Sequence, residues 1–424
     1  MKKLPSNRAI EVAEQIDTPA KTTRLLLRML RAAQPVSRIE LARRLGVNRS
    51  TVTDILKPLI IAGLIREEPF VLPAKKIRLQ GRPPIGLRFN SDNDYFVGVN
   101  IGVRHSQMGL TTLGGEILAE EEFETPPQVS NALKLITEKI ARLRLKAAGR
   151  GLRVIGISVP GPANAERGGL LYAPHLGWKN VEIAELMRKS LAFAGFEDNY
   201  SIVVENDATA SAMYEARLHL RKTDKGLLKN FILLRSGTGI GIGLVIDGEV
   251  YRGMDGSEGI AGEFGHMTVV AGGKPCVCGN RGCWERYASA SAASSLYAGD
   301  RANFRGAEPL RFIQIVERAE AGEIKARRTL ERLGEYLGIG IANVITALGV
   351  PRIIVSGRLV YGWKYIKQPL FEAVGKSMAG KLVDLTIECG EPQGAALGGA
   401  LEIAIEEFLR HGFLPQTNDT NPQA

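Results

Sequence analysis

Long hydrophobic runs are absent from this sequence of 424 residues. No apolar stretch approaches the ~20 uninterrupted residues that a membrane-spanning helix needs. The basic start, MKKLPSNRAIEVAEQ, also lacks the apolar segment that follows the charged residues of a secretory signal. We therefore expect a cytoplasmic protein with no membrane partner. Its 45% hydrophobic and 24% charged residues exclude wholesale disorder, and its length suits about three domains.

Cysteine is scarce: the four are Cys276, Cys278, Cys283 and Cys389, and three of them fall within eight residues. Three thiolates this close, ten residues after His266, can complete a tetrahedral Cys₃His site for Zn²⁺. Such a zinc would be structural, because four protein ligands leave no position for an activated water. A disulfide between Cys276 and Cys278 is the alternative, which a cytoplasmic location disfavours. Cys389 stands alone in a strand-like stretch, and we expect it in the core.

Excess charge is missing from most of the chain. Residues 93–424 hold 37 Lys and Arg against 37 Asp and Glu, so the formal net charge of +10 comes entirely from residues 1–92, which hold 18 against 8. This asymmetry predicts an N-terminal arm that binds a polyanion, either nucleic acid or an anionic membrane surface. The alternative is a basic surface that contacts only solvent.

The basic arm has the pattern of a helix-turn-helix. Leucines recur at helical spacing over residues 22–33, Ser37 can cap a second helix, and Gly46 would end it before a third helix capped by Asn48. We expect the inner face of the second helix to hold Ile39, Leu41, Ala42 and Leu45. The outer face of the third helix should present the DNA-reading side chains Arg49, Ser50, Thr51, Thr53 and Lys57.

A basic β-hairpin is expected after these helices, with a first strand near residues 61–70 and a second at residues 87–89. Its tip would carry Lys75, Lys76 and Arg82. Helix-turn-helix and hairpin together predict a winged helix that binds double-stranded operator DNA, with the third helix in the major groove and the tip on phosphate or the minor groove. A three-helix module that serves only for packing is the alternative.

The rest of the chain alternates strands and helices. Three strands are expected between residues 94 and 123, a helix over 131–150, and a buried strand in VIGISVPGP. A helix through 208–217 lies between two further strand-like runs, and a long helix near 325–348 leads to the strand RIIVSG and a last glycine-rich helix. This order predicts an α/β body, and the similar opening of its two halves indicates a duplicated unit.

The runs EFGHMTV and CVCGNRGCWERYAS resemble the ROK family of repressors, open reading frames and sugar kinases, and the resemblance covers roughly residues 22–410. It implies an actin-like ATPase fold of two α/β lobes. With the winged helix, the chain is similar to the repressor branch, the xylose, glucose or N-acetylglucosamine regulators. We expect five segments: a disordered segment over residues 1–20, a winged helix-turn-helix over 21–92, a first lobe over 93–205, a second lobe over 206–410 and a polar tail over 411–424. The second lobe should contain the zinc loop, and its last helix should return to the first lobe.

The same resemblance implies a sugar site. Family members bind sugar through the END-A motif, the E-x-G-H motif and the glutamate two residues beyond the last cysteine of the cluster. We also assign the glycine after the VIGISVP strand to this site. Carried over, the sugar-binding residues are Gly161, Asn206, Asp207, Glu263, His266 and Glu285. Zinc would fix His266 and bring Glu285 alongside it.

The nucleotide elements of the family kinases are degraded. Where those kinases have an acidic residue and a small turn residue, this chain has Asn100 and Val103, and their Gly-Gly-Gly turn is replaced by residues 356–359, SGRL. The second phosphate loop, with Gly237, Thr238 and Gly239, is intact, but glycines there could equally serve close packing. We therefore expect no ATP binding, no kinase activity and no catalytic residue.

The expected function is that of a sugar-responsive repressor of carbohydrate uptake or catabolism genes. It would act as a homodimer or homotetramer, because two-fold operators require at least a dimer. Sugar binding would close the two lobes and rotate the DNA-binding arm. One alternative is a bifunctional sugar kinase that uses Asp207 as the catalytic base, and another is a regulator controlled by a protein partner.

Overall fold

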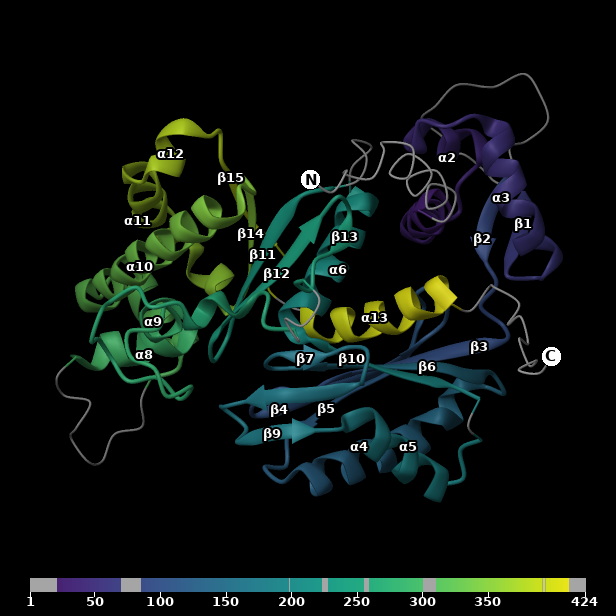
Figure 1. The fold of residues 1–424 in the computed structure, drawn as a ribbon, viewed down its shortest axis with the longest axis horizontal. Helices are drawn as coiled ribbons and strands as arrows, with labels where there is room; N and C mark the ends of the chain where they lie inside the picture. Colours follow the sequence, from purple (N-terminus) through teal and green to yellow (C-terminus); the bar gives the residue numbers. More distant parts are fainter. Residues whose placement is uncertain are drawn as a thin grey trace, which may run out of the picture.

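The computed structural model describes residues 21–69, 85–197, 199–222, 228–254, 259–299, 310–390, 392 and 394–411. A small N-terminal module, purple in Figure 1, sits on a larger body built on two five-stranded sheets. Within those ranges no helix combines the length and the apolar character needed to cross a membrane.

The N-terminal module is a winged helix-turn-helix. A helix over residues 21–33 precedes α2 (Arg38–Leu45) and α3 (Arg49–Ile61), and β1 (Ile65–Pro69) pairs antiparallel with β2 (Ile85–Phe89). Every element contributes to its core, which includes Leu26, Leu30, Leu41, Leu56, Ile65 and Leu87. The described residues do not include the predicted hairpin tip with Lys75, Lys76 and Arg82.

One prediction for these helices was wrong, and one holds only in part. Ile39 is 62% exposed instead of facing inward. It lies two residues from the buried Leu41, which places it ~200° away around the helix. Ser37 does cap α2, since its hydroxyl accepts the Glu40 N–H at 3.2 Å. Asn48 occupies the N-cap position of α3, but its side chain makes no capping hydrogen bond.

The first sheet of the body has the strand order β10-β6-β3-β4-β5 and, with its helices, forms what we call the first lobe. The bounds are β3 (Asp94–Asn100), β4 (His105–Thr111), β5 (Ile117–Glu124), β6 (Gly151–Val159), β10 (Ser201–Asn206), α4 (Val129–Leu143) and α5 (Ile183–Phe193). Both helices cover one face, and α13 (Ala395–His411) covers the other (Figure 1). Every residue of β3 is consequently buried.

A small antiparallel sheet, β7-β8-β9, adjoins this lobe. Its strands are β7 (Ala163–Asn164), β8 (Gly169–Ala173) and β9 (Trp178–Val181). The stretch from Leu171 to Trp178 is a hairpin with its turn at residues 174–177. Gly161 faces this hairpin with φ +144°, and a Cβ there would lie 2.2 Å from the Tyr172 carbonyl oxygen, so only glycine fits.

The second sheet has the order β13-β12-β11-β14-β15 and belongs to what we call the second lobe. Its strands are β11 (Phe231–Ser236), β12 (Ile240–Ile246), β13 (Glu249–Val250), β14 (Arg352–Gly357) and β15 (Thr386–Cys389). Side chains alternate along β11: Ile232 and Leu234 pack toward the helices of this lobe, whereas Leu233 packs toward α6 (Asp207–Lys222). Those helices are α8 (Ala290–Ala298), α9 (Phe312–Glu320), α10 (Ile324–Leu348), α11 (Trp363–Lys376) and α12 (Met378–Leu382).

The prediction that Cys389 is a core residue was wrong. It is the last residue of β15, the edge strand of the second sheet, and its side chain is exposed. Only Ile387 of this strand is buried, because an edge strand has a neighbouring strand on one side only.

Two helices join the lobes. α6 packs on β11 and β12 of the second lobe and also on α13, which lies directly against β3 and β6 of the first lobe. Close packing of α13 depends on two glycines: a Cβ on Gly98 would lie 2.6 Å from the Leu401 nitrogen, and one on Gly156 would lie 2.4 Å from the Ala400 oxygen. A movement of one lobe against the other therefore has to pass through α6 and α13.

Candidate functional site

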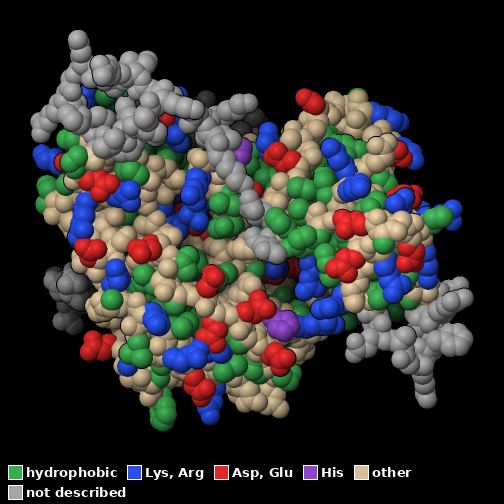
Figure 2. Space-filling model, turned by 180° about the vertical axis from the view of Figure 1, so that it is seen from behind, with side chains coloured by type: hydrophobic (Ala, Val, Ile, Leu, Met, Phe, Trp, Pro, Cys, Tyr) green, Lys and Arg blue, Asp and Glu red, His purple; other side chains and the backbone are tan. Residues whose placement is uncertain are grey.

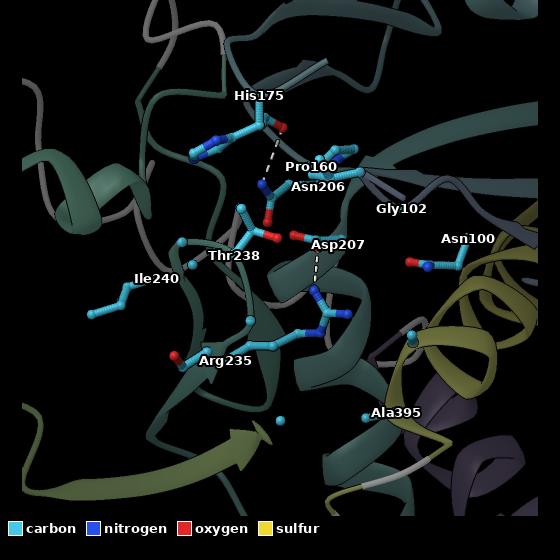
Figure 3. Close-up of a pocket in the computed structure, with 18 of the residues that line it drawn as sticks. Asn100, Gly102, Pro160, His175, Asn206, Asp207, Arg235, Thr238, Ile240 and Ala395 are labelled. Carbon is cyan, nitrogen blue, oxygen red and sulfur yellow. Dashed lines mark hydrogen bonds and ion pairs between the residues drawn. The ribbon is translucent and has the colours of Figure 1, made fainter. Parts of the chain in front are cut away.

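A cavity of about 1440 Å³ lies between the two lobes, and Figure 3 looks into it. Its walls are the carboxyl ends of strands from both sheets: Asn100 ends β3, Asn206 ends β10, Ser236 ends β11 and Gly357 ends β14. Ligands of open α/β sheets bind in this position, because the strand ends leave a crevice there.

All six predicted sugar-binding residues line this cavity. They come from the turn after β6, the junction of β10 with α6, the short 3-10 helix η2 (Glu263–His266) and the start of α7 (Glu285–Ala288). The structure thus gathers side chains that are as many as 124 residues apart in the chain, namely Gly161, Asn206, Asp207, Glu263, His266 and Glu285.

Asn206 is largely committed to holding the fold together. Its Oδ1 accepts the N–H groups of Ala208 at 2.9 Å and Thr209 at 3.1 Å, so it caps the start of α6. Its Nδ2 donates to the Gly161 carbonyl at 3.0 Å (Figure 3). One amide hydrogen of Asn206 is left to meet a ligand.

Glu285 lies at the centre of the polar groups. Its Oε1 is 3.7 Å from His266 Nδ1, 3.7 Å from His175 Nε2 and 3.0 Å from Cys276 Sγ. Burial alone would raise the pKa of Glu285, but these three neighbours outweigh it and lower that pKa. A buried anionic carboxylate is a strong acceptor for a ligand hydroxyl.

His175 was not predicted from the sequence. It stands in the turn between β8 and β9, and no motif marks it. Its Nε2 is buried without a hydrogen-bond partner among the described residues. The 3.7 Å to Glu285 is too long for a hydrogen bond, so a ligand hydroxyl placed there would satisfy both groups.

The two ring nitrogens of His266 face opposite ways. Nδ1 is 3.6 Å from Cys276 Sγ, and Nε2 is 4.0 Å from Glu263 Oε2. His266 can therefore bind a metal ion through Nδ1 while Nε2 faces the cavity.

Glu263, the acidic neighbour of His266 Nε2, has a shifted pKa. Burial, together with the charges of Asp207 and Glu285, raises the pKa of Glu263 to about 7.

The four predicted metal ligands lie together. The donor atoms of His266, Cys276, Cys278 and Cys283 are all within 4.8 Å of one another, and Cys278 Sγ is 3.7 Å from Cys283 Sγ. Tetrahedral zinc with Zn–S bonds of ~2.3 Å requires S···S separations of ~3.8 Å. The donor set and its spacing thus fit a closed tetrahedral metal site.

Asp207 carries an ion pair that the sequence did not reveal. Its Oδ2 accepts a hydrogen bond from Arg235 Nη1, and Figure 3 shows the two side chains meeting at the start of α6. Arg235 interrupts the apolar strand β11, which was a signal that sequence reasoning passed over. The carboxylate that a kinase would need as its base is therefore engaged by a guanidinium.

The predicted phosphate-loop residues Gly237, Thr238 and Gly239 form the turn between β11 and β12 and line the cavity. The Gly237 N–H donates to the Gly239 carbonyl at 3.1 Å, so this amide is already used. A Cβ on Gly239 would lie 2.3 Å from Glu285 Oε2. A side chain at position 239 would displace the carboxylate of Glu285, so the glycine serves the packing of these polar groups whether or not phosphate binds.

The first phosphate-loop position is occupied by Asn100, whose side chain is buried. Its Oδ1 accepts a hydrogen bond from Ser158 Oγ at 3.0 Å. A neutral amide held in this way supplies no negative charge for a metal ion.

On the N-terminal module, α3 turns the predicted DNA-reading side chains outward. Val52, Leu56 and Leu59 are buried on the inner side. Thr51 is half-buried, and the exposed predicted residues are Arg49, Ser50, Thr53 and Lys57.

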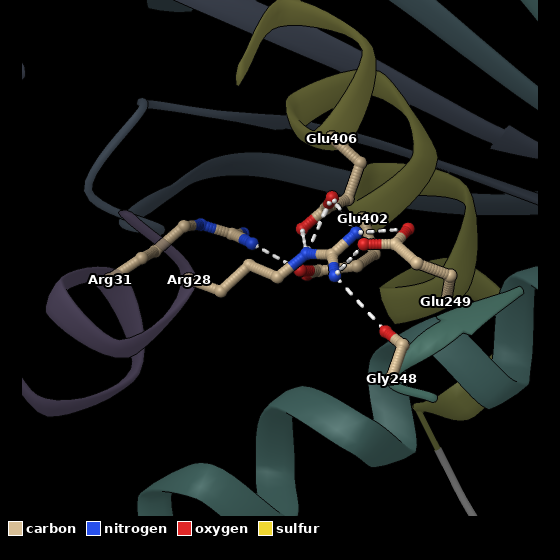
Figure 4. Close-up of polar contacts among 6 residues, drawn as sticks. All are labelled: Arg28, Arg31, Gly248, Glu249, Glu402 and Glu406. Carbon is tan, nitrogen blue, oxygen red and sulfur yellow. Dashed lines mark hydrogen bonds and ion pairs between the residues drawn. The ribbon is translucent and has the colours of Figure 1, made fainter. Parts of the chain in front are cut away.

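The N-terminal module is joined to both lobes through Arg28 (Figure 4). Its guanidinium contacts Glu406 of α13 at 2.7 Å, and it contacts Glu249 Oε1 at 3.0 Å and the Gly248 oxygen at 3.1 Å, at the start of β13. Burial alone would lower the pKa of Arg28, but Glu406 and Glu249 raise it. One side chain thus links α13, the second lobe and the module.

A second ion pair, which is buried, lies beside Arg28. Arg31 Nη1 is 2.5 Å from Glu402 Oε1 on α13, and both side chains are almost fully buried. Phe96 of the first lobe meets Phe408 of α13 edge-on, with ring centroids 5.2 Å apart, in the apolar cluster that also holds the leucines of the module. The module is therefore packed firmly on α13 and the first lobe.

These features define a two-lobed body of the sugar-kinase type that carries a winged helix-turn-helix. The ROK family model matches residues 96–407, and the chain belongs to the ROK family. The MarR family model matches residues 22–69, within the N-terminal module.

Relatives resemble the chain over nearly its whole length. The xylose repressor of Bacillus spizizenii is 28% identical over 407 residues, which cover 94% of this chain and 99% of the repressor. A crystal structure of a ROK family transcriptional regulator, a homologue of the E. coli MLC protein, has 26% identity and a TM-score of 0.70 and covers 92% of this chain and 96% of its own. A ROK glucokinase from Streptomyces griseus, in complex with glucose and AMPPNP, has 25% identity and a TM-score of 0.60. The match covers 73% of this chain and 99% of the glucokinase chain.

Proposed function

We propose that this protein is a cytoplasmic DNA-binding repressor that responds to a sugar and controls genes of carbohydrate uptake or catabolism. One observation carries the proposal: α13, on which the helix-turn-helix is packed, also contributes its first turn to the wall of the cavity between the lobes. The similarity to the xylose repressor, which extends over both parts, supports the same conclusion.

The DNA-reading element is α3. Its exposed hydroxyl and basic side chains suit base edges in the major groove, while the basic wing engages phosphate. Two copies of α3 in a dimer or tetramer would contact successive major grooves ~34 Å apart, so the operator is a two-fold repeat.

Arg49→Ala should cost ~1–3 kcal/mol of operator binding and relax the base preference at one position, because a side chain that contacts a base edge is removed. The measurement is a binding assay over single-base operator variants. The matched control, Arg328→Ala, removes the same charge from an exposed position of α10 and should change nothing. Equal losses for both variants would show that the effect comes from net charge and would remove α3 from the reading surface.

The sugar would lie among Glu263, Glu285 and His175. Carboxylates accept hydrogen bonds from vicinal hydroxyls, and the unpartnered Nε2 of His175 supplies a further polar contact. Since such buried groups lose their partners when a hydroxyl is missing, the site should reject deoxy analogues strongly.

Structural zinc would hold this arrangement. Bound by Cys276, Cys278, Cys283 and Nδ1 of His266, it would fix the imidazole so that Nε2 faces the sugar. It would also fix the cysteine loop, whose last cysteine lies two residues before Glu285 at the start of α7.

Kinase activity is, we propose, lost. Asp207 is paired with Arg235, Asn100 offers no charge for a metal ion, and residues 356–359, SGRL, stand where the family kinases have a Gly-Gly-Gly turn. The sugar elements are kept, and the elements for phosphate transfer are altered.

Incubation with a sugar, ATP and Mg²⁺ should therefore give no ADP above the background rate, because the general base is engaged and the metal ligand is missing. A coupled ADP assay over glucose, N-acetylglucosamine and xylose makes the measurement. Turnover that disappears in Asp207→Asn would establish the alternative, a bifunctional kinase.

The sugar signal would reach DNA through Arg28. The module is fixed to α13 by apolar packing and reaches the second lobe through Gly248 and Glu249. If sugar closes the cavity, β13 moves relative to α13 and displaces this contact, which reorients the module. A coupling of ~1–3 kcal/mol would change operator affinity about 5- to 150-fold.

A further inference from the structure

A short segment of the second lobe, residues 248–252, reaches both the DNA-binding module and the strand that leads into the sugar site. We call it the connecting segment. Near its start, the Glu249 carboxylate contacts Arg28 of the module at 3.0 Å (Figure 4). At its end, Arg252 Nε donates to Glu205 Oε2 at 2.7 Å, next to the last residue of β10. The two contacts are thus separated by only three positions in the chain.

Glu205 is tied to the junction of β10 with α6, where two of the proposed sugar-binding residues stand. Its Oε1 accepts the Asn206 N–H at 3.0 Å, and both Asn206 and Asp207 line the cavity. The Glu205 side chain is only 6% exposed, whereas that of Arg252 is 36% exposed. A carboxylate buried to this extent depends on its cationic partner, because loss of that partner leaves an uncompensated charge. The ion pair therefore joins the junction to the connecting segment.

The sheet itself holds the connecting segment lightly. Its strand β13 has two residues and lies at the edge of the second sheet, where Val250 pairs with Val245 and Glu249 with Ile246 of β12. An edge strand has a neighbouring strand on one side only, so it can shift at a smaller loss of hydrogen bonds than a central strand. Figure 2 shows a hollow between the two halves of the molecule, which leaves room for the lobes to close. A displacement of the junction would therefore carry the connecting segment with it.

We propose that the ion pair between Glu205 and Arg252 transmits sugar binding to the DNA-binding module, with Arg252 as a positioning residue. This inference rests on the proposed function, because it names the contact through which the sugar site acts on Arg28. Sugar bound at Asn206 and Asp207 shifts the junction of β10 with α6. Arg252 follows Glu205, and the connecting segment moves against Arg28. Neither member of the pair is among the described residues that line the cavity, so the pair carries the signal without touching the ligand.

The test measures sugar affinity and operator response separately in the full-length protein. Arg252→Met removes the cation and keeps an unbranched side chain. Calorimetry with glucose, xylose, N-acetylglucosamine and the phosphate esters of all three should show a sugar affinity close to that of the parent protein. The ratio of operator affinities with and without the sugar that binds should fall from about 5- to 150-fold in the parent to below ~2-fold in the variant. Operator DNA for the assay is selected by the parent protein from a random pool.

A double variant, Glu205→Gln with Arg252→Met, separates the loss of the ion pair from the cost of an unpaired buried charge, because it leaves no charge behind. It should match the parent by circular dichroism, bind sugar and also lose the operator response. The matched control is Arg352→Met. The Arg352 side chain is 34% exposed, and its partner Glu388 lies on the neighbouring strand of the same lobe. This control should keep the full response.

The remaining outcomes separate the inference from the proposed function. A full operator response in either variant of the pair overturns the inference and leaves the sugar response standing. Loss of sugar binding in the double variant assigns the pair to the sugar site itself and also overturns the inference. An equal loss of response in Arg352→Met would show that removal of any such ion pair has this effect, with the same consequence. If no sugar changes the operator affinity of the parent protein, the proposed function itself is overturned.

Discussion

Replacement of Cys278 by serine should release zinc and weaken sugar binding at least ~10-fold. The variant removes one of four ligands from a set whose donor atoms lie within 4.8 Å, so metal affinity should fall steeply. Without the metal, the Nδ1 side of His266 has no fixed partner, and Glu285 loses the loop that holds it. Cys278 is suited to the test because it is only partly buried, which limits the cost in packing.

The measurements are the metal content of the purified chain, expected to be one zinc per chain, and a calorimetric titration with the sugar. The matched control is Cys389→Ser, which changes the same atom at an exposed position on β15. It should keep both zinc and sugar affinity. Sugar affinity that survives in Cys278→Ser after zinc is lost would show that the metal does not support the site.

Glu249→Gln should leave sugar binding intact and remove most of the response of operator affinity to sugar. The substitution removes the ion pair between Arg28 and Glu249 and leaves the Gly248 carbonyl at 3.1 Å as the contact of Arg28 with the second lobe, while Arg28 keeps its contacts with Glu406 at 2.7–3.0 Å. Glu249 is 37% exposed, so stability should change little. A response of about 5- to 150-fold in the parent protein should approach onefold in the variant.

Asp247→Asn is the matched control for this prediction. It makes the same change from carboxylate to amide two residues away, in the turn before β13, and asparagine tolerates its φ of +52°. Its operator response should match the parent. A full response in Glu249→Gln would show that the signal does not depend on the ion pair between Arg28 and Glu249.

Local sequence signals predicted much of this fold. The Ser37 cap, the αL glycine at Gly46 and the leucine spacing of residues 22–33 each depend on neighbours within one turn of helix, so they could be recognised without a structure. The cysteine cluster lies within eight residues, which is why its ligands could be grouped in advance.

Contacts between distant segments could not be predicted in this way. Arg28 and Glu406 are 378 residues apart, and Arg235 and Asp207 are 28 apart, so no period or spacing connects them. His175 belongs to a hairpin that the sequence did not reveal, because its strands are only four or five residues long. The outward position of Cys389 likewise depends on strand order, which the sequence of β15 does not contain.

The central claim is that a sugar bound between the lobes changes the affinity of α3 for DNA. The most direct test titrates the sugar that binds most tightly against the full-length protein on its operator, with calorimetry on the same preparation. We predict a change in operator affinity of about 5- to 150-fold that saturates at the sugar concentrations that fill the site. Operator affinity that stays constant at every concentration, while calorimetry shows the sugar bound, would contradict the account.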